Sequence, residues 1–184
     1  TEERAEARHG EATVGFIRLV ALAVLYVNHL NTYFGLGIGY PAYHRQITAM
    51  VGVWAILGAI GWRMARRGPY HPFQAYVTTA LDAALLTAIL GVSDGIQSPL
   101  IVVYYLVIAT AGFRYSRILP LWAAGLCVAG YTVLTLSGTP EPLYARFIKT
   151  ISMGLMGLMA GTIVGRFQKL VGRAVTAALS ISGF

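Results

Sequence analysis

The stretch Ala12–His44 reads ATVGFIRLVALAVLYVNHLNTYFGL and then GIGYPAYH, and it decides the fold. Its first part, residues 12–36, is an apolar run, and about 20 consecutive apolar residues cross a bilayer as a helix. Glycines and a proline then end that helix and begin a return. His29 lies near the far end of the first helix, and His44 opens the second. We therefore expect a transmembrane hairpin with two imidazoles at one membrane face.

The composition is typical of a membrane protein. Of the 184 residues, 57% are hydrophobic and 11% are charged, with a mean hydropathy of +0.64, whereas soluble domains carry about 25% charged residues. Cys127 is the single cysteine, so the chain can form no internal disulfide and no cysteine-based metal site. The polar N-terminal segment is mixed in charge, unlike the basic start of a cleavable signal peptide, and the first hydrophobic segment is therefore expected to be an anchor.

Six apolar segments can be drawn, and glycine, proline and charged residues separate them. They are Ala12–Leu36, Tyr43–Met64, Pro72–Val92, Pro99–Phe113, Ile118–Leu136 and Leu143–Gly165. Because the connections are short, consecutive helices should be antiparallel neighbours. The fourth segment is the shortest, near the lower limit of about 17 residues for a span. The sequence predicts an all-α polytopic membrane protein, a six-transmembrane-helix bundle with a C-terminal cytoplasmic signalling helix.

The cations indicate how this bundle is oriented. Six spans place both termini on one side, and 11 of the 14 Lys and Arg residues fall on that side; the other three are Arg45, Arg146 and Lys149. This asymmetry follows the positive-inside rule. We expect a multi-pass protein of the cell inner (plasma) membrane, in contact with the lipid bilayer, with both termini cytoplasmic. The net charge of +7 is dispersed at the ends of apolar runs, so it reports topology, and no nucleic acid is expected as a partner.

The segments divide into three parts. Residues 1–11 are expected to be a cytoplasmic N-terminal segment, residues 12–165 a six-helix transmembrane sensor domain, and residues 166–184 a cytoplasmic exit helix leading to a missing effector. Apolar side chains in the exit helix recur at helical spacing: Phe167, Leu170, Val171, Ala174, Val175 and Ala178. An interfacial anchor helix is the alternative. We favour a signalling helix that forms a homodimer with its copy.

A small-residue ridge on the sixth helix bears on this dimer. Gly157, Gly161 and Gly165 recur every four residues, a spacing that lets two helices approach closely. The ridge suits either packing within one chain or a dimer seam. We favour the dimer seam, through helix six and the exit helix, because helix six leads directly into the output segment.

The four histidines fall into two pairs in this topology. His9 and His71 belong near the cytoplasmic face, and His29 and His44 near the outer face. Each pair comes from different helical segments, and two imidazoles from facing helices are what six-coordinate haem iron requires. The alternative for each histidine is an amphipathic side chain at the interface. Zinc is less favoured, because no Cys, Asp or Glu lies near either pair to complete four ligands.

Three charged side chains could serve such a cofactor. Arg18 could contact an inner haem propionate and Arg45 an outer one, because arginine binds carboxylates well. The alternatives are snorkelling for Arg18 and interfacial anchoring for Arg45. Asp82 is the only acid within a span. It is either a hydrogen-bond or proton partner for a quinone or haem-linked group, or a structural pair with Arg18.

The six spans, the pairs His9–His71 and His29–His44, and the helix Arg166–Phe184 resemble a known family. They are similar to the six-helix dihaem membrane anchors found ahead of class III adenylate cyclase domains in some bacteria, which are in turn similar to the succinate dehydrogenase cytochrome b anchor. The resemblance implies two haem b groups per chain with these four histidines as metal ligands, regulation by quinone, and a dimeric cyclase downstream. His9 departs from the pattern, since it falls before the first apolar run.

The function expected from the sequence is a membrane-embedded redox or quinone sensor domain that regulates a C-terminal adenylate cyclase. No nucleotide-binding glycine loop, nucleophile elbow or HExxH run occurs, so this fragment is not expected to be an enzyme itself. The alternatives are a haem-free six-helix receptor for a lipophilic signal, feeding a cyclase or histidine kinase, and a passive dimerising anchor.

Overall fold

A computed structural model describes residues 2–35, 41–67, 72–93, 95–114, 116–138 and 141–182, with the backbone alone for 2–9, 72 and 172–182. These residues contain α-helices and short helical turns but no strand, which confirms the all-α class. The helices are α1 (Glu2–Leu30), α2 (Pro41–Arg67), α3 (Pro72–Val92), α4 (Val103–Gly112), α5 (Leu119–Ser137) and α6 (Leu143–Ser182). A π-helical turn, η1 (Asn31–Gly35), continues α1, and two 3₁₀ turns, η2 (Gly95–Gln97) and η3 (Pro99–Val102), precede α4.

Five of the helical stretches are long and apolar enough to cross a membrane. They are Gly10–Gly35, Pro41–Arg67, Phe73–Val92, Leu119–Ser137 and Leu143–Val171. The predicted transmembrane character is therefore confirmed for these five, while the count of six spans stays a prediction.

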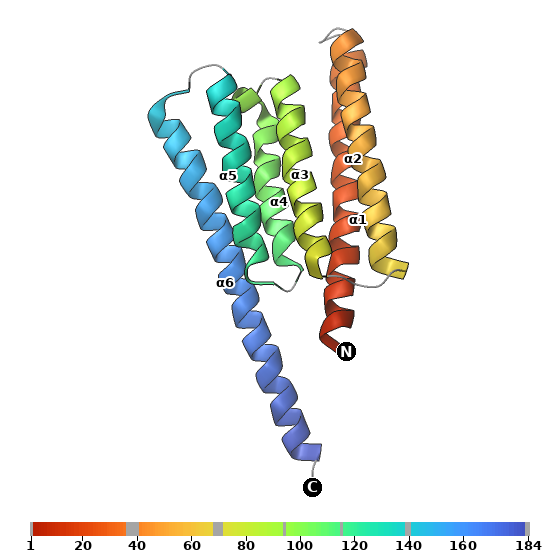
Figure 1. Cartoon of the computed structure of the whole chain (residues 1–184), viewed down its shortest axis with the longest axis vertical. Helices are drawn as coiled ribbons and strands as arrows, with labels where there is room; N and C mark the ends of the chain where they lie inside the picture. Colours follow the sequence, from red (N-terminus) through yellow and green to blue (C-terminus); the bar gives the residue numbers. More distant parts are fainter. Residues whose placement is uncertain are drawn as a thin grey trace.

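The fourth stretch, Pro99–Gly112, is shorter, and its first turn is 3₁₀. Ser98 caps that turn, because its side chain accepts a hydrogen bond of 3.2 Å from the backbone N–H of Leu100. A 3₁₀ turn rises about 2.0 Å per residue, against about 1.5 Å in an α-helix, so the same residues reach farther along the bundle. The helix α4 packs against α3, α5 and α6, within the bundle (Figure 1).

The helices form two groups. Helices α3, α4, α5 and α6 pack on one another, and the hairpin of α1 and α2 lies beside them next to α3 (Figure 1). The N- and C-termini lie at the same end of the molecule, and α6 extends beyond the bundle at that end (Figure 1). No break separates the predicted exit helix from the sixth segment, because α6 is continuous over its 40 residues.

The core lies within α3–α6. The largest fully buried side chains there are Leu86, Leu90, Tyr104, Ile108, Leu119, Tyr131 and Met153. Buried Tyr104 is satisfied, since its hydroxyl shares a hydrogen bond of 2.7 Å with Thr87. Large apolar side chains on the outer faces are exposed, as a lipid-facing surface requires; those on α2 and α6 include Ile56, Ile60, Phe147, Ile148, Leu155 and Ile163.

The glycine ridge of α6 packs against α5 of the same chain. A Cβ atom added to Gly157 would lie 2.6 Å from Cβ of Ala124 and 2.9 Å from the carbonyl oxygen of Pro120. Packing within one chain, one of the two alternatives for this ridge, is thus the one observed. A homodimer through helix six and the exit helix stays a prediction.

This packing gives a matched pair of substitutions on α6. We expect Gly157→Leu to lower the stability of the protein by about 1–3 kcal/mol, the usual effect of forcing extra methylenes into a packed interface. Gly154→Leu is the control, because nothing lies within 4 Å of a Cβ added there. Thermal unfolding in detergent measures both. Equal losses of stability at the two positions would show that the close approach of α5 and α6 is wrong.

Candidate functional site

The two outer histidines meet at the end of the hairpin. His29 of α1 and His44 of α2 share a hydrogen bond of 3.1 Å between Nε2 and Nδ1, respectively. Their ring planes differ by 12° and their ring centres are 5.3 Å apart. Since the two nitrogens are closer than the ring centres, they lie on the facing edges of the rings. The structure therefore brings this predicted pair into direct contact.

Tyrosine rings flank the pair. The ring of Tyr33 stacks on His44 at 4.2 Å between ring centres, and the ring of Tyr26 stacks on His29 at 6.1 Å between ring centres. Tyr33 belongs to the π-helical turn η1 at the end of α1; such wide turns are frequent at functional sites. We call Tyr26, His29, Tyr33 and His44 the ring cluster. It contains aromatic surface and imidazole nitrogens at one end of the molecule.

The two imidazole nitrogens of His29 and His44 face each other, as axial ligands of haem iron do. The gap between them is too small for an iron ion. Two imidazole nitrogens that share a metal ion lie about 4 Å apart, twice a metal–nitrogen distance of about 2.0 Å, whereas these are 3.1 Å apart. The adjoining cavity of about 50 Å³ has room for a few water molecules and not for a tetrapyrrole. As arranged, the residues do not fit haem. Haem b at this pair stays a prediction.

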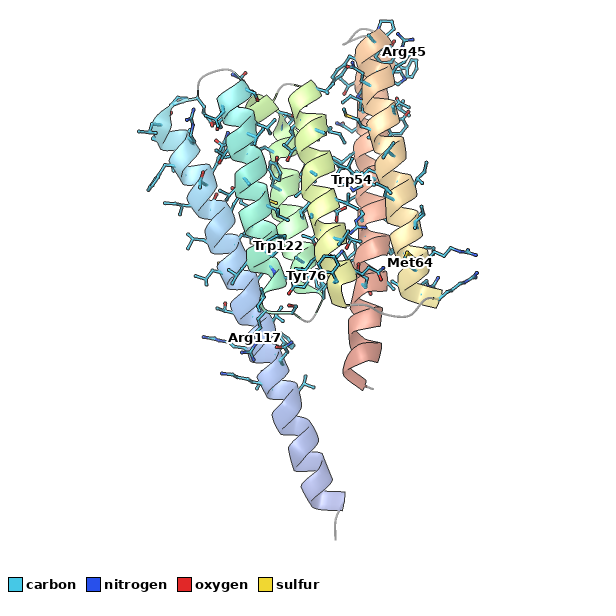
Figure 2. The ribbon with its side chains drawn as sticks, viewed as in Figure 1. Arg45, Trp54, Met64, Tyr76, Arg117 and Trp122 are labelled. Carbon is cyan, nitrogen blue, oxygen red and sulfur yellow. The ribbon has the colours of Figure 1, made fainter. Side chains whose placement is uncertain are left out.

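Three other residues predicted to serve haem are His9, His71 and Arg45. His71 lies outside the described residues, and of His9 only the helical backbone is described, so their pairing stays a prediction. Arg45 is exposed at the end of the hairpin (Figure 2). Within the part of the chain that the structure describes, no group of three or more His, Cys, Asp or Glu side chains could hold a metal ion.

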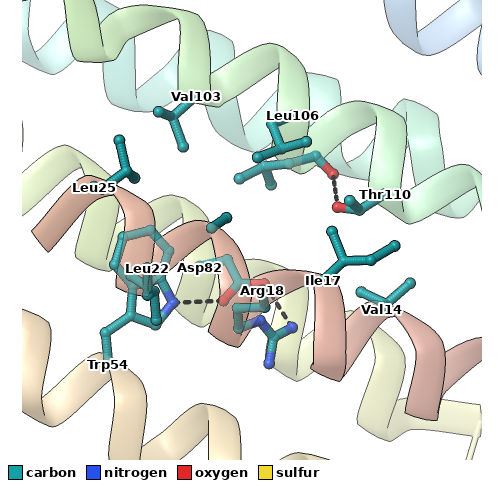
Figure 3. Close-up of a pocket in the computed structure, with 12 residues that line it drawn as sticks. Val14, Ile17, Arg18, Leu22, Leu25, Trp54, Asp82, Val103, Leu106 and Thr110 are labelled. Atoms are coloured by element: carbon teal, nitrogen blue, oxygen red, sulfur yellow. Dashed lines mark hydrogen bonds and ion pairs between the residues drawn. The ribbon is translucent and has the colours of Figure 1, made fainter. Parts of the chain in front are cut away.

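Asp82 holds three helices together deep in the molecule. Its Oδ2 lies 2.6 Å from Nη2 of Arg18 on α1, and its Oδ1 accepts a hydrogen bond of 2.8 Å from Nε1 of Trp54 on α2 (Figure 3). The three side chains are buried or nearly so. Of the two interpretations left open for Asp82, the pair with Arg18 is the one observed. Arg18 directs Nη2 to this carboxylate, and its predicted contact with a haem propionate stays a prediction. We call these three residues the Asp82 node.

A second buried ion pair, which sequence reasoning missed, joins α1 to the end of α4. Nε of Arg114 lies 3.0 Å from Oε2 of Glu11, and both side chains are at least 96% buried. Nη1 of Arg114 also donates hydrogen bonds to the carbonyl oxygen of Ala75 at 2.7 Å and to Oγ1 of Thr79 at 2.6 Å, both on α3. Thr78 donates to Oε1 of Glu11 at 3.2 Å.

This pair adds to the description of residues 1–11. Their cytoplasmic location stays a prediction, while the structure shows that helix α1 already begins at Glu2 and that Glu11 is buried. The spacing of the polar residues along α1 could have indicated this burial. Arg18 and His29 follow Glu11 by seven and eighteen residues, about two and five helical turns, so the three lie on one face of α1.

That face of α1 lines the surface where the hairpin meets α3 and α4, which we call the seam. Two cavities lie along it, of about 50 Å³ and about 30 Å³, and both are lined by Leu22, Leu25 and Trp54. The larger reaches His29, and the smaller reaches the Asp82 node and Thr110 (Figure 3). Nε of Arg18 is buried beside the smaller cavity without a hydrogen-bond partner among the described residues. The seam therefore combines apolar walls with an unused donor.

Comparison of the chain with protein-family models, curated proteins and solved structures finds no match.

The Asp82 node predicts a specific pattern of mutant stabilities. Removing one partner of a buried ion pair leaves an uncompensated charge and costs about 3–5 kcal/mol, whereas apolar replacement of both partners is often close to neutral. We expect Arg18→Met and Asp82→Leu each to destabilise the protein strongly, and the double variant to be more stable than either. Equilibrium unfolding of the four proteins measures this double-mutant cycle. Additive losses would mean that the two side chains do not interact.

Proposed function

We propose that this chain is the membrane-embedded sensor domain of a signalling protein, in which the α1–α2 hairpin receives the signal and α6 carries it out. The observation that supports this most is the seam, where buried ion pairs and cavities lie side by side. Ionisable side chains within a membrane are costly and usually functional. Ion pairs alone would also suit a passive anchor, whereas the cavities beside them are space that packing leaves unfilled.

The signal that suits the seam is a small lipophilic molecule with a hydrogen-bond acceptor, such as a quinone. Its ring would lie against Leu22, Leu25 and Trp54, and its carbonyl would accept a hydrogen bond from Nε of Arg18, which has no partner among the described residues. Because the cavities hold only about 30 and 50 Å³, the hairpin must move outward to admit such a ligand. The ligand then favours the open arrangement over the closed one.

The output follows from the course of α6. This helix packs on α4 and α5 and then continues beyond the bundle at the end where the N-terminus lies (Figure 1). A change in the hairpin that reaches the bundle therefore has a continuous rod through which to act. The effector in this proposal is a cytoplasmic adenylate cyclase, which the resemblance implies; a histidine kinase is the alternative for a haem-free receptor.

The tryptophans allow ligand binding to be measured directly. In a Trp62→Phe/Trp122→Phe variant the fluorescence comes from Trp54, which lines both cavities. We expect a benzoquinone with one isoprenoid unit, added to this variant in lipid nanodiscs, to quench the fluorescence with a saturable curve, because the quinone occupies a site beside the indole. Arg18→Lys keeps the charge opposite Asp82 but lacks Nε, so it should weaken binding roughly tenfold.

The matched control is a Trp54→Phe/Trp62→Phe variant, which leaves Trp122 on α5, 44% exposed. Quinone dissolved in the lipid should quench Trp122 without saturation. The same unsaturable quenching of Trp54 would exclude a site in the seam and leave the passive anchor as the better interpretation.

One observation favours haem as a second candidate ligand, namely the nitrogens of His29 and His44 on facing edges of their rings. An absorption spectrum of the purified protein decides between the two. The hydrogen-bonded pair predicts no Soret band that depends on these residues. A Soret band that disappears in His44→Ala, while the protein stays folded, would instead establish a haem site and overturn the closed arrangement of the ring cluster.

A further inference from the structure

The connection between α4 and α5 contains two arginines that contact opposite sides of the molecule. Arg114 faces the hairpin and α3, through Glu11, Ala75 and Thr79. Arg117, three residues later, faces α6. Its Nη2 donates a hydrogen bond of 3.2 Å to the carbonyl oxygen of Gly165, and its Nε donates one of 3.1 Å to Oε1 of Gln168.

Arg117 lies unusually close to the backbone of α6. A Cβ atom added to Gly161 would lie 2.8 Å from the carbonyl oxygen of Arg117, and one added to Gly165 would lie 2.9 Å from Nε of Arg117. The two glycines thus make room for the backbone and side chain of Arg117. This contact lies at the lower end of the bundle, where α6 leaves it (Figure 2).

We propose that Arg114 and Arg117 couple the position of the hairpin to the exit half of α6. The inference rests on the proposed function in one respect, that the hairpin moves. An outward movement of α1 withdraws Glu11 from Arg114. Arg114 then loses the buried carboxylate of Glu11, and breaking a buried ion pair is strongly unfavourable, so Arg114 shifts and takes the connection with it. Arg117 lies on that connection and loses its hold on Gly165 and Gln168.

Arginine suits this role better than lysine would. Arg114 contacts Glu11 through Nε while Nη1 serves Ala75 and Thr79, and only a planar guanidinium offers donors in such a fixed fork. The position of the Arg114 side chain therefore depends on α1 and α3 together. Loss of either contact leaves the other strained, which makes the connection sensitive to the position of α1 relative to α3.

The coupling can be measured without any ligand. Spin labels at Leu121→Cys on α5 and Leu170→Cys on α6, both exposed positions, report the distance between the bundle and the exit half of α6 by pulsed EPR in nanodiscs. Native Cys127 is fully buried. Glu11→Gln removes the carboxylate charge that faces Arg114 and changes neither labelled helix. We expect it to shift the mean distance by about 1–2 Å, the usual size of a helix shift at an interface, or to broaden the distribution.

Non-additivity is the decisive part of the test. If the effect passes through Arg117, then Glu11→Gln should change nothing further in an Arg117→Met background, which should itself show the shifted distribution. Glu141→Gln is the matched control, since Glu141 pairs with Lys149 at 2.5 Å near the opposite end of α6. The control should leave the labelled distance unchanged.

Two results would overturn the coupling. One is an unchanged distribution in Glu11→Gln when Arg117→Met does shift it; the other is two effects that simply add. If Glu11→Gln fails to fold, Thr78→Val replaces it, because it leaves the Glu11–Arg114 ion pair in place and removes the Thr78 hydroxyl that donates to Glu11 and to the carbonyl oxygen of Ala75; it should give a smaller shift in the same direction. A negative result in this EPR experiment does not affect the quinone titration followed by Trp54 fluorescence. The sensor proposal and the coupling are therefore tested separately.

Discussion

The position of the hairpin depends on the two contacts that the carboxylate of Asp82 makes. This carboxylate receives Arg18 from α1 and Trp54 from α2, and α3 supplies the acid itself. A single Arg or Asp at the centre of a membrane helix is unfavourable by about 2.5–3.5 kcal/mol on insertion scales. Each charge therefore needs the other, and the two helices that carry them must stay in register. The indole N–H satisfies the second carboxylate oxygen and fixes α2 as well.

The polar character of the seam has a physical reason in the bilayer. Lipid tails are as apolar as leucine, so hydrophobic burial gives little drive for one helix to pack on another there. Directional ion pairs such as Arg18–Asp82 and Glu11–Arg114 supply specificity that apolar contacts lack. They also make the association two-state, because a half-separated ion pair in a dry seam is worse than a closed or a fully hydrated one. A seam of this kind suits an element that opens and closes.

The sequence predicted the helices and the hairpin well, because apolar runs of membrane length interrupted by glycine and proline leave few alternatives. It also predicted that His29 and His44 approach one another, since both flank one short connection. The distance between their ring nitrogens could not be predicted, because the sequence pattern indicates which residues are neighbours but not how far apart their atoms lie. That separation decides whether the pair suits haem.

The burial of Glu11 and Arg114 was missed for a different reason. Both lie at the ends of apolar runs, where charged side chains normally face water, and only the helical spacing of Glu11, Arg18 and His29 marks one polar face of α1. The sequence pattern likewise did not predict the 3₁₀ turn before α4, although Ser98 and Pro99 are a recognisable cap. Long-range pairing, such as Glu11 with Arg114, comes from tertiary packing and has no local signature.

The central claim is that the hairpin moves away from α3 and α4 when the seam is occupied. Pulsed EPR between labels at Ile56→Cys on α2 and Val133→Cys on α5, both lipid-facing, measures this most directly in nanodiscs with and without the short-chain quinone. The account predicts that a second, longer distance gains population as quinone is added. A single distance that stays the same at every quinone concentration would contradict it.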